Sequence, residues 1–143
     1  MPRVHRAVAL IGESDRALRE LMRRTLEAAD YAILEGGSAL QLEVVLRTKH
    51  VTHAPRALLV VSIAMFEACS AVVEAFTQRR VALGLPTPHV LLTCEFGTLR
   101  NSSPPDFGEC FSVGILEKPF DLTLLQGIAY RCRMWPQASR VSL

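Results

Sequence analysis

Polar side chains that could do chemistry follow or end four short apolar runs of the chain. They are Glu13, Ser14 and Asp15 after residues 8–11, Ser62 within residues 57–63, Thr93 at the end of residues 89–93, and Lys118 after residues 112–116. Carboxylate, hydroxyl and amine groups are candidates for catalysis or for ligand binding. A serine beside a lysine can form a nucleophile and its base. Either chemistry requires that the fold bring these residues together.

The four runs, with a fifth at residues 31–34, are typical of buried strands because apolar residues occupy nearly every position. Amphipathic helices are expected between them, capped by Ser14 or Asp15, by Ser38 and by Asp121, with a further helix over residues 67–83 and a polar loop over residues 50–55. The predicted inner faces of the helices are Leu18, Leu21, Met22, Thr25 and Leu26; Leu40, Val44 and Val45; Val72, Val73 and Phe76; and Leu124, Leu125, Ile128 and Cys132.

Strands that are buried on both faces need helices on both sides of a parallel sheet. Right-handed crossovers then favour a doubly wound α/β sandwich of three layers. In such folds the working crevice lies at the carboxyl ends of the strands. We therefore expect Glu13, Ser62, Thr93 and Lys118 to meet at one edge of the sheet.

Composition limits the kind of protein. The chain has 143 residues, of which 50% are hydrophobic and 21% charged, with a net charge of +2. These values fit one domain, predicted over residues 1–133 with 134–143 as a tail or linker, and exclude a disordered chain.

No apolar run approaches the ~20 residues of a membrane span, and the N-terminus shows no secretory signal. Four cysteines without a C-x-x-C pair favour reduced thiols in a cytoplasmic protein. We expect neither a membrane nor a nucleic-acid partner.

Three stretches match the pattern of one family. Residues 10–21 give a strand, an acidic cluster and a helix; residues 91–94 give a strand that ends in a hydroxyl; residues 114–120, Gly-Ile-Leu-Glu-Lys-Pro-Phe, place a lysine before a proline. Together they resemble the receiver domain of bacterial two-component response regulators over about residues 6–133. The resemblance implies the CheY-like, flavodoxin-like (βα)5 fold with strand order 2-1-3-4-5, and a cis peptide bond before Pro119.

Receiver domains bind a phosphoryl group at the crevice. The resemblance puts Ser62 at the position of the family's phosphoacceptor aspartate, and Glu13 and Ser14 at its acidic pair, which holds Mg²⁺. It puts Thr93 and Lys118 where the family binds the phosphoryl oxygens. A serine without an adjacent base is a poor nucleophile, and two of the three anionic ligands for Mg²⁺ are replaced by hydroxyls.

No small shift of the alignment restores the acceptor, because no aspartate lies between Asp30 and Asp106. The site is therefore predicted to be a degenerate phosphorylation site, without metal, cofactor or catalytic residue. Asp15 suits the start of the first helix better than a metal. A buried lysine without phosphate still needs a partner, so we expect an ion pair between Lys118 and Glu13. Thr93 would then close a local hydrogen bond.

The sequence also departs from the family in the region that forms the output surface of receiver domains, namely the fourth helix, the fifth strand and the fifth helix. Residues 95–108 contain two adjacent prolines and two glycines, which oppose a regular helix. The family's fourth helix is therefore predicted to be shortened or replaced by a loop. Ile115 stands at the family's aromatic switch position. Phe96, Phe107 and Phe111 are the predicted interaction face.

Three functions remain open at this point. The first is a pseudo-receiver, a phosphorylation-independent protein-interaction module in bacterial signal transduction, with protein partners or a homodimer. The second is an anion or small-ligand sensor that uses Thr93 and Lys118. The third is a small α/β enzyme that uses Ser62 and Lys118.

Overall fold

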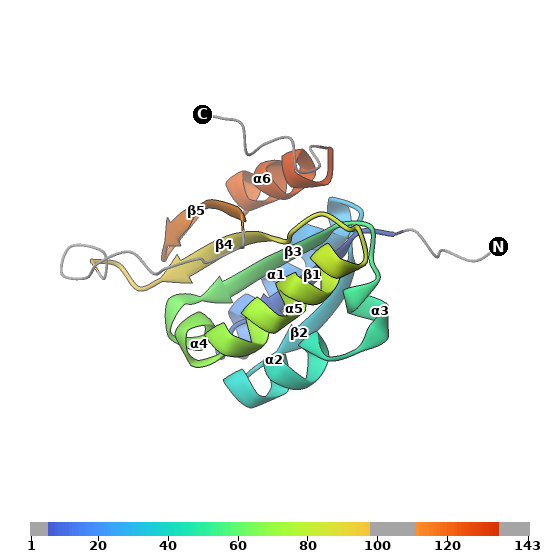
Figure 1. Cartoon of the computed structure of the whole chain (residues 1–143). Coiled ribbons are helices and arrows are strands. Elements are labelled where there is room, and N and C mark those ends of the chain that lie inside the picture. The colour runs from blue at the N-terminus through green and yellow to red at the C-terminus, as the bar shows by residue number, and fades with distance from the viewer. Residues whose placement is uncertain (1–5, 98–110, 135–143) are drawn as a thin grey trace.

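The five apolar runs form one parallel sheet, as the sequence predicts. In the computed structural model, which describes residues 6–97 and 111–134, the strand order is β2-β1-β3-β4-β5. The strands are β1 (Val8–Gly12), β2 (Ala32–Gly36), β3 (Ala57–Ser62), β4 (His89–Cys94) and β5 (Phe111–Glu117). Neighbouring strands are all parallel, so their carboxyl ends lie at the same edge of the sheet (Figure 1).

Helices cover both faces of the sheet, which confirms the three-layer sandwich. They are α1 (Arg16–Ala28), α2 (Ala39–Leu46), α3 (Lys49–Thr52), α4 (Ile63–Ala68), α5 (Ser70–Ala82) and α6 (Leu122–Met134). Helices α1 and α6 pack on one face, and α2 to α5 pack on the other (Figure 1). Side chains alternate along a strand, so β3 contributes to the core on each face of the sheet. Leu59 and Val61 pack under α2 to α5, and Leu58 and Val60 pack under α1 and α6.

Polar side chains at the helix starts satisfy free backbone N–H groups. Asp15 accepts hydrogen bonds from the N–H groups of Ala17 and Leu18, and Ser38 accepts one from Gln41. At α6 the Asp121 carboxylate accepts a hydrogen bond from the N–H of Thr123. The caps that the sequence predicts at these three helices are therefore present.

Two glycines are required by their surroundings. A Cβ on Gly36 would lie 2.8 Å from the backbone nitrogen of Leu42, so only glycine lets α2 pack this closely on β2. Gly114 has a φ of +144° and lies where the pairing of β4 with β5 shifts by one residue, between Val90 and Leu91.

The structure corrects the predicted helix between β3 and β4. Helix formation starts at Ile63, directly after β3, rather than at Glu67, and a break at Cys69 separates α4 from α5. The reason is that Ser62 caps the first turn and no glycine or proline follows it. The predicted loop over residues 50–55 likewise contains the short helix α3.

Four residues that the sequence places on the inner faces of helices are exposed in the structure. Leu40 and Val44 are exposed, and α2 instead buries Leu42 and Leu46, because the close contact at Gly36 turns this side of the helix to the sheet. Leu21 on α1 and Leu124 on α6 are also exposed. Each lies one residue before a fully buried side chain, Met22 or Leu125, and so belongs to the flank of its helix.

Several predictions fall outside the described residues. The replacement of the family's fourth helix concerns residues 95–108, of which only 95–97 are described, and Phe107 is not among them. The predicted tail, residues 134–143, is described only at Met134, the last residue of α6. The domain boundary therefore stays a prediction.

A buried arginine fixes the end of the sheet opposite the crevice. Arg80 on α5 is fully buried and forms no ion pair with a described carboxylate. Its guanidinium donates hydrogen bonds to the backbone oxygens of Pro86 (2.9 Å), Thr52 (3.1 Å) and Ala54 (2.6 Å). Burial lowers the pKa of Arg80 to about 10, so the group remains charged at neutral pH. It joins α5 to the segments that precede β3 and β4.

Replacing Arg80 by methionine should therefore destabilise the fold. The substitution leaves buried carbonyl oxygens without donors, and we expect the free energy of unfolding to fall by about 3 kcal/mol. Urea unfolding followed by circular dichroism measures this. The matched control is Arg24→Met, which removes an exposed pair with Glu20 and should have a much smaller effect. Equal losses in the two variants would contradict this role for Arg80.

Candidate functional site

The sheet brings the predicted site residues to one edge. Ser62 at the end of β3 pairs with Thr93 on β4, and Thr93 pairs with Leu116 on β5. Glu13 follows the last residue of β1, and Lys118 follows the last residue of β5. The carboxyl ends of β1, β3, β4 and β5 thus form the crevice that the sequence predicts.

Glu13 and Lys118 form the ion pair expected from the sequence. Lys118 Nζ lies 2.9 Å from Glu13 Oε1, and the Glu13 side chain is only 2% exposed while that of Lys118 is 19% exposed. The other carboxylate oxygen, Oε2, accepts a hydrogen bond from the N–H of Asp15 at 2.9 Å. Oε2 is therefore hydrogen-bonded, whereas Oε1 contacts Lys118 as an ion pair and has no hydrogen-bond partner among the described residues.

The charge of Lys118 is held in place. Burial lowers its pKa, but the hydrogen bond and charge of Glu13, together with those of Glu95, outweigh burial and raise the pKa above its usual value. The ammonium group therefore stays charged through the neutral range, and no anion is needed to compensate it.

Glu95 is a site residue that the sequence reasoning missed. Its Oε2 lies 3.3 Å from Lys118 Nζ, although its side chain is 78% exposed. Glu117 is another, since its carboxylate accepts the N–H of Gly97 at 3.0 Å. The signal was present, because β4 and β5 are neighbours in the predicted strand order and Glu95 stands just beyond the end of β4.

Ser62 is occupied as a helix cap. Its hydroxyl oxygen accepts the N–H of Met65 at 3.4 Å, at the first turn of α4. No base contacts it: among the described residues, its side chain has no other hydrogen-bond partner. The pair of Ser62 and Lys118 that an enzyme would need is therefore absent, since Lys118 contacts two glutamates instead.

Thr93 corrects one expectation. It is fully buried, but its hydroxyl oxygen has no hydrogen-bond partner within the described part of the chain. The reason is that its neighbour across the strands, Ser62, turns its hydroxyl toward Met65. A buried hydroxyl without a partner is uncommon and costs free energy.

The remaining predicted residues lie around the crevice. Ser14 is exposed, and Asp15 caps α1 rather than facing a metal. The peptide bond between Lys118 and Pro119 is cis. Ile115 packs partly buried against the core under α2 to α5, and Phe96 is 68% exposed. Phe111 belongs to β5, and its side chain is not described.

No metal site is evident in the described ranges. Nowhere in residues 6–97 and 111–134 do three or more histidine, cysteine, aspartate or glutamate side chains gather in a way that could hold a metal ion. Within the same residues, no helix combines the length and apolar composition that crossing a membrane requires.

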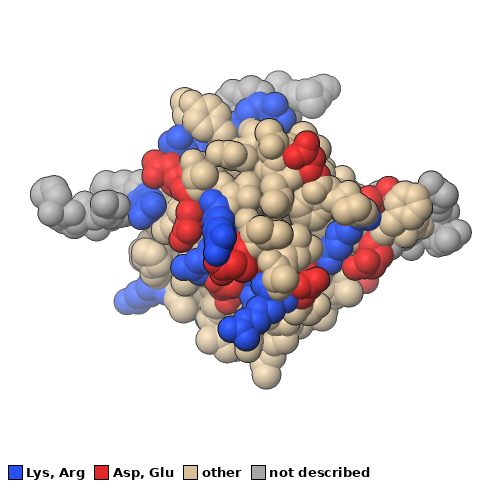
Figure 2. All heavy atoms as spheres, turned by 180° about the vertical axis from the view of Figure 1, so that it is seen from behind, with Lys and Arg blue, Asp and Glu red and all other residues tan. Residues whose placement is uncertain are grey.

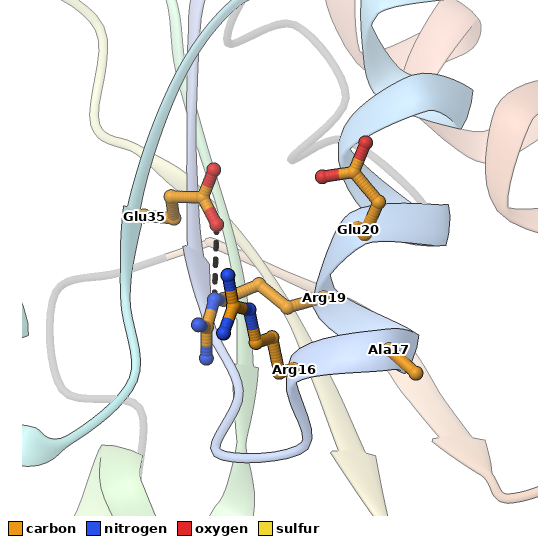
Figure 3. Close-up of a pocket in the computed structure, with 5 residues that line it drawn as sticks. All are labelled: Arg16, Ala17, Arg19, Glu20 and Glu35. Carbon is orange, nitrogen blue, oxygen red and sulfur yellow. Dashed lines mark hydrogen bonds and ion pairs between the residues drawn. The ribbon is translucent and has the colours of Figure 1, made fainter.

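The arginine-rich side of α1 borders a hollow beside the crevice. The hollow is lined by Arg16, Ala17, Arg19, Glu20 and Glu35 (Figure 3). Arg19 donates to the backbone oxygen of Glu13 at 2.7 Å and pairs with Glu35 on β2 at 2.9 Å. Arg19 therefore fixes the chain at Glu13, so that the carboxylate stays directed at Lys118.

Other arginines of α1 are paired as well. Arg23 contacts both Glu35 and Glu27, and Arg24 pairs with Glu20. Figure 2 shows basic and acidic side chains next to one another on this side of the molecule. The arginine cluster of α1 is thus largely balanced by glutamates.

Comparisons with known proteins show the fold. No protein-family model matches the sequence, and no curated protein matches it. Solved structures do match. A CheY-like response regulator receiver domain protein from Methanospirillum hungatei is 14% identical with a TM-score of 0.63, over 91% of this chain and 97% of that one. A receiver domain from Methylobacillus flagellatus is 20% identical with a TM-score of 0.56, over 87% of this chain and 98% of that one.

A third match has a different description. It comes from a novel family of redox sensors in the streptococci that evolved from two-component response regulators. It is 15% identical with a TM-score of 0.60, and the match covers 95% of this chain but 56% of that one. With the observed strand order, these similarities establish the CheY-like receiver fold for this chain.

Breaking the ion pair should reveal how strongly its members depend on each other. Lys118→Met leaves the Glu13 carboxylate buried and unpaired, which should reduce the free energy of unfolding by about 3 kcal/mol. In the double variant Glu13→Gln/Lys118→Met no buried charge remains, so part of this loss should be recovered. Urea unfolding of the wild type, both single variants and the double variant measures the coupling. Strictly additive losses would show that the two residues do not interact.

The ion pair should also make the free energy of unfolding decrease at alkaline pH. A lysine whose pKa is raised in the folded protein contributes stability below its unfolded pKa, and this contribution is lost as the pH rises through the folded pKa. We expect the stability difference between wild type and Lys118→Met to be constant near neutral pH and to fall above about pH 10.4. Unfolding curves at a series of pH values test this. A difference that persists unchanged to about pH 12 would contradict it.

Proposed function

We propose that this chain is a phosphorylation-independent protein-interaction module of bacterial signal transduction, built on the receiver fold. The observation that carries the proposal is the buried contact between Glu13 and Lys118. In a phosphorylated receiver, the lysine must be available to the phosphoryl group and the acidic residue to Mg²⁺. Here each is committed to the other.

The chemistry of the crevice supports the same proposal. The hydroxyl of Ser62 caps α4, and a serine without a base does not attack a phosphoryl donor at a useful rate. Asp15 is held by the N–H groups of α1. A hard cation such as Mg²⁺ needs several fixed oxygen ligands, and these residues offer few that are free. Neither phosphoryl transfer nor another enzymatic reaction is part of the proposed function.

Partners are proposed to be proteins. The exposed ring of Phe96, just beyond β4, lies next to the charged residues Glu95 and Glu117. An exposed aromatic residue among charges is the usual composition of a protein contact. Phe107 and Phe111 complete the proposed face by their positions in the sequence. The module is proposed to act in the cytoplasm, alone or as a homodimer, without binding a membrane or nucleic acid.

Redox sensing, the description of one structural relative, finds less support here. The described cysteines Cys69, Cys94 and Cys132 are all buried. Burial raises the pKa of each thiol, and for Cys132 to about 12. A sensor cysteine needs an accessible thiolate, so these three are better suited to the core.

One observation favours a second candidate. The hydroxyl of Thr93 is buried beside the crevice and has no hydrogen-bond partner in the described residues. A small anion that displaced Glu95 from Lys118 could accept a hydrogen bond from Thr93. The chain would then be an anion sensor that uses the position of the phosphoryl group.

Treatment with acetyl phosphate and Mg²⁺ tests the proposed function. We expect intact-mass spectrometry to find no phosphoryl adduct on the wild type and none on Ser62→Ala, because neither protein offers a carboxylate acceptor. A hydroxylamine-sensitive adduct on the wild type would overturn the proposal. Inorganic phosphate should leave the melting temperature unchanged. A concentration-dependent rise that Thr93→Val abolishes would favour the anion sensor instead.

A further inference from the structure

Two stretches of the chain contain basic residues and no acidic ones. Residues 44–66 lie between Glu43 and Glu67, and residues 75–94 lie between Glu74 and Glu95; neither contains an aspartate or a glutamate. All 14 acidic residues lie outside these stretches, together with 11 of the 16 basic ones. A surface built from both stretches therefore carries positive charge that its own residues do not compensate.

The fold brings the two stretches together. Arg79 on α5 donates a hydrogen bond to the backbone oxygen of Leu46, the last residue of α2, at 3.0 Å. Arg80 donates to the oxygens of Thr52, the last residue of α3, and of Ala54, two residues further on. Figure 1 shows α3 beside the ends of α2 and α5. We call the exposed residues gathered here the basic surface; they are Arg47, Lys49, His50, His53 and Arg79.

The charges of the basic surface are not neutralised within the described chain. Arg47, Lys49, His50 and His53 are exposed, and none of them forms an ion pair with a described residue. Glu43 stands one helical turn before Arg47 but forms no ion pair with it. The end of a helix offers only about half a negative charge. On α1, by contrast, Arg23 pairs with Glu27 and Glu35 and Arg24 pairs with Glu20, which leaves Arg16 as the exposed arginine of this helix without an ion pair to a described residue.

An apolar strip adjoins the basic surface. Leu40, Val44 and Arg47 follow each other at helical spacing along one side of α2. Leu40 is 72% and Val44 62% exposed, although both are large aliphatic side chains. The strip and the basic surface together match a ligand that combines negative charge with apolar side chains. A nucleic-acid backbone offers the charge but no aliphatic side chains, and neither the basic surface nor the strip contains a phenylalanine, tyrosine or tryptophan for base stacking.

We propose that the basic surface and the strip of Leu40 and Val44 bind an acidic, amphipathic segment of a partner protein. The inference rests on the proposed function as a protein-interaction module and gives the chemistry of one partner. Charge complementarity supplies attraction and orientation, and the aliphatic strip supplies apolar contact. The basic surface lies at the opposite end of the sheet from Phe96 and the crevice, and the strip runs along α2 toward it. The module would then have a second face for partners, apart from Phe96.

A titration with a model peptide tests the proposal. The probe is a labelled amphipathic peptide of glutamate and leucine, and the control is the same pattern with lysine in place of glutamate. We expect amide NMR signals of residues 44–53 and 79 to shift with the glutamate peptide alone. The variant Arg47→Glu/Lys49→Glu should weaken binding by about tenfold or more, since each change replaces attraction by repulsion. The matched charge reversal elsewhere, Arg16→Glu/Arg131→Glu, should leave affinity within about twofold.

Each other outcome overturns the inference. Absence of binding, shifts confined to the region of Phe96, or equal weakening in both charge-reversed variants would show that this surface does not select an acidic segment. Tighter binding of a labelled DNA duplex through the same residues would assign the surface to nucleic acid instead. The acetyl phosphate experiment is independent, because an adduct on the crevice would overturn the proposed function while leaving the peptide result in place.

Discussion

The buried ion pair between Glu13 and Lys118 is the interaction on which the account of this molecule depends. It joins the end of β1 to the end of β5 across the strands that lie between them. A buried charge without its partner is far more costly than a satisfied pair, so the two residues hold each other in one arrangement. Arg19 fixes the backbone at Glu13, and Glu95 adds a second contact to Lys118. The crevice is therefore filled by the protein's own charges.

The two ends of the sheet differ in the charge of their exposed and buried side chains. At the carboxyl end, glutamates surround one lysine and leave little positive charge for an anion. At the opposite end, Arg80 is buried among backbone oxygens, and the exposed basic residues near it form no ion pair with any residue of 6–97 or 111–134. The ion pair occupies the crevice and leaves the surfaces at both ends of the sheet available. This is consistent with the function proposed above, a module that binds proteins without phosphorylation.

Much of the fold could be predicted from the sequence because its strongest signals are simple. Five apolar runs predict a parallel sheet, and the resemblance of the Lys118–Pro119 stretch to receiver domains implies the cis peptide bond that the structure contains. The rest could not, for physical reasons. The inward side of α2 depends on the close approach of Leu42 to Gly36, a packing contact that helical periodicity does not reveal, so the predicted inward positions of Leu40 and Val44 are wrong. The early start of α4 depends on Ser62, whose capping role was hidden by its position at the expected acceptor site.

The state of the Glu13 carboxylate during a Mg²⁺ titration tests the central claim most directly. Carbon-13 NMR of the side-chain carboxyl groups observes it without altering the protein. If Lys118 and Asp15 occupy both oxygens, the Glu13 signal will stay unchanged as Mg²⁺ is added, with and without a phosphoryl mimic such as beryllium fluoride. A saturable shift of that signal would show that the crevice opens to a metal ion, and it would contradict the claim that the ion pair closes it.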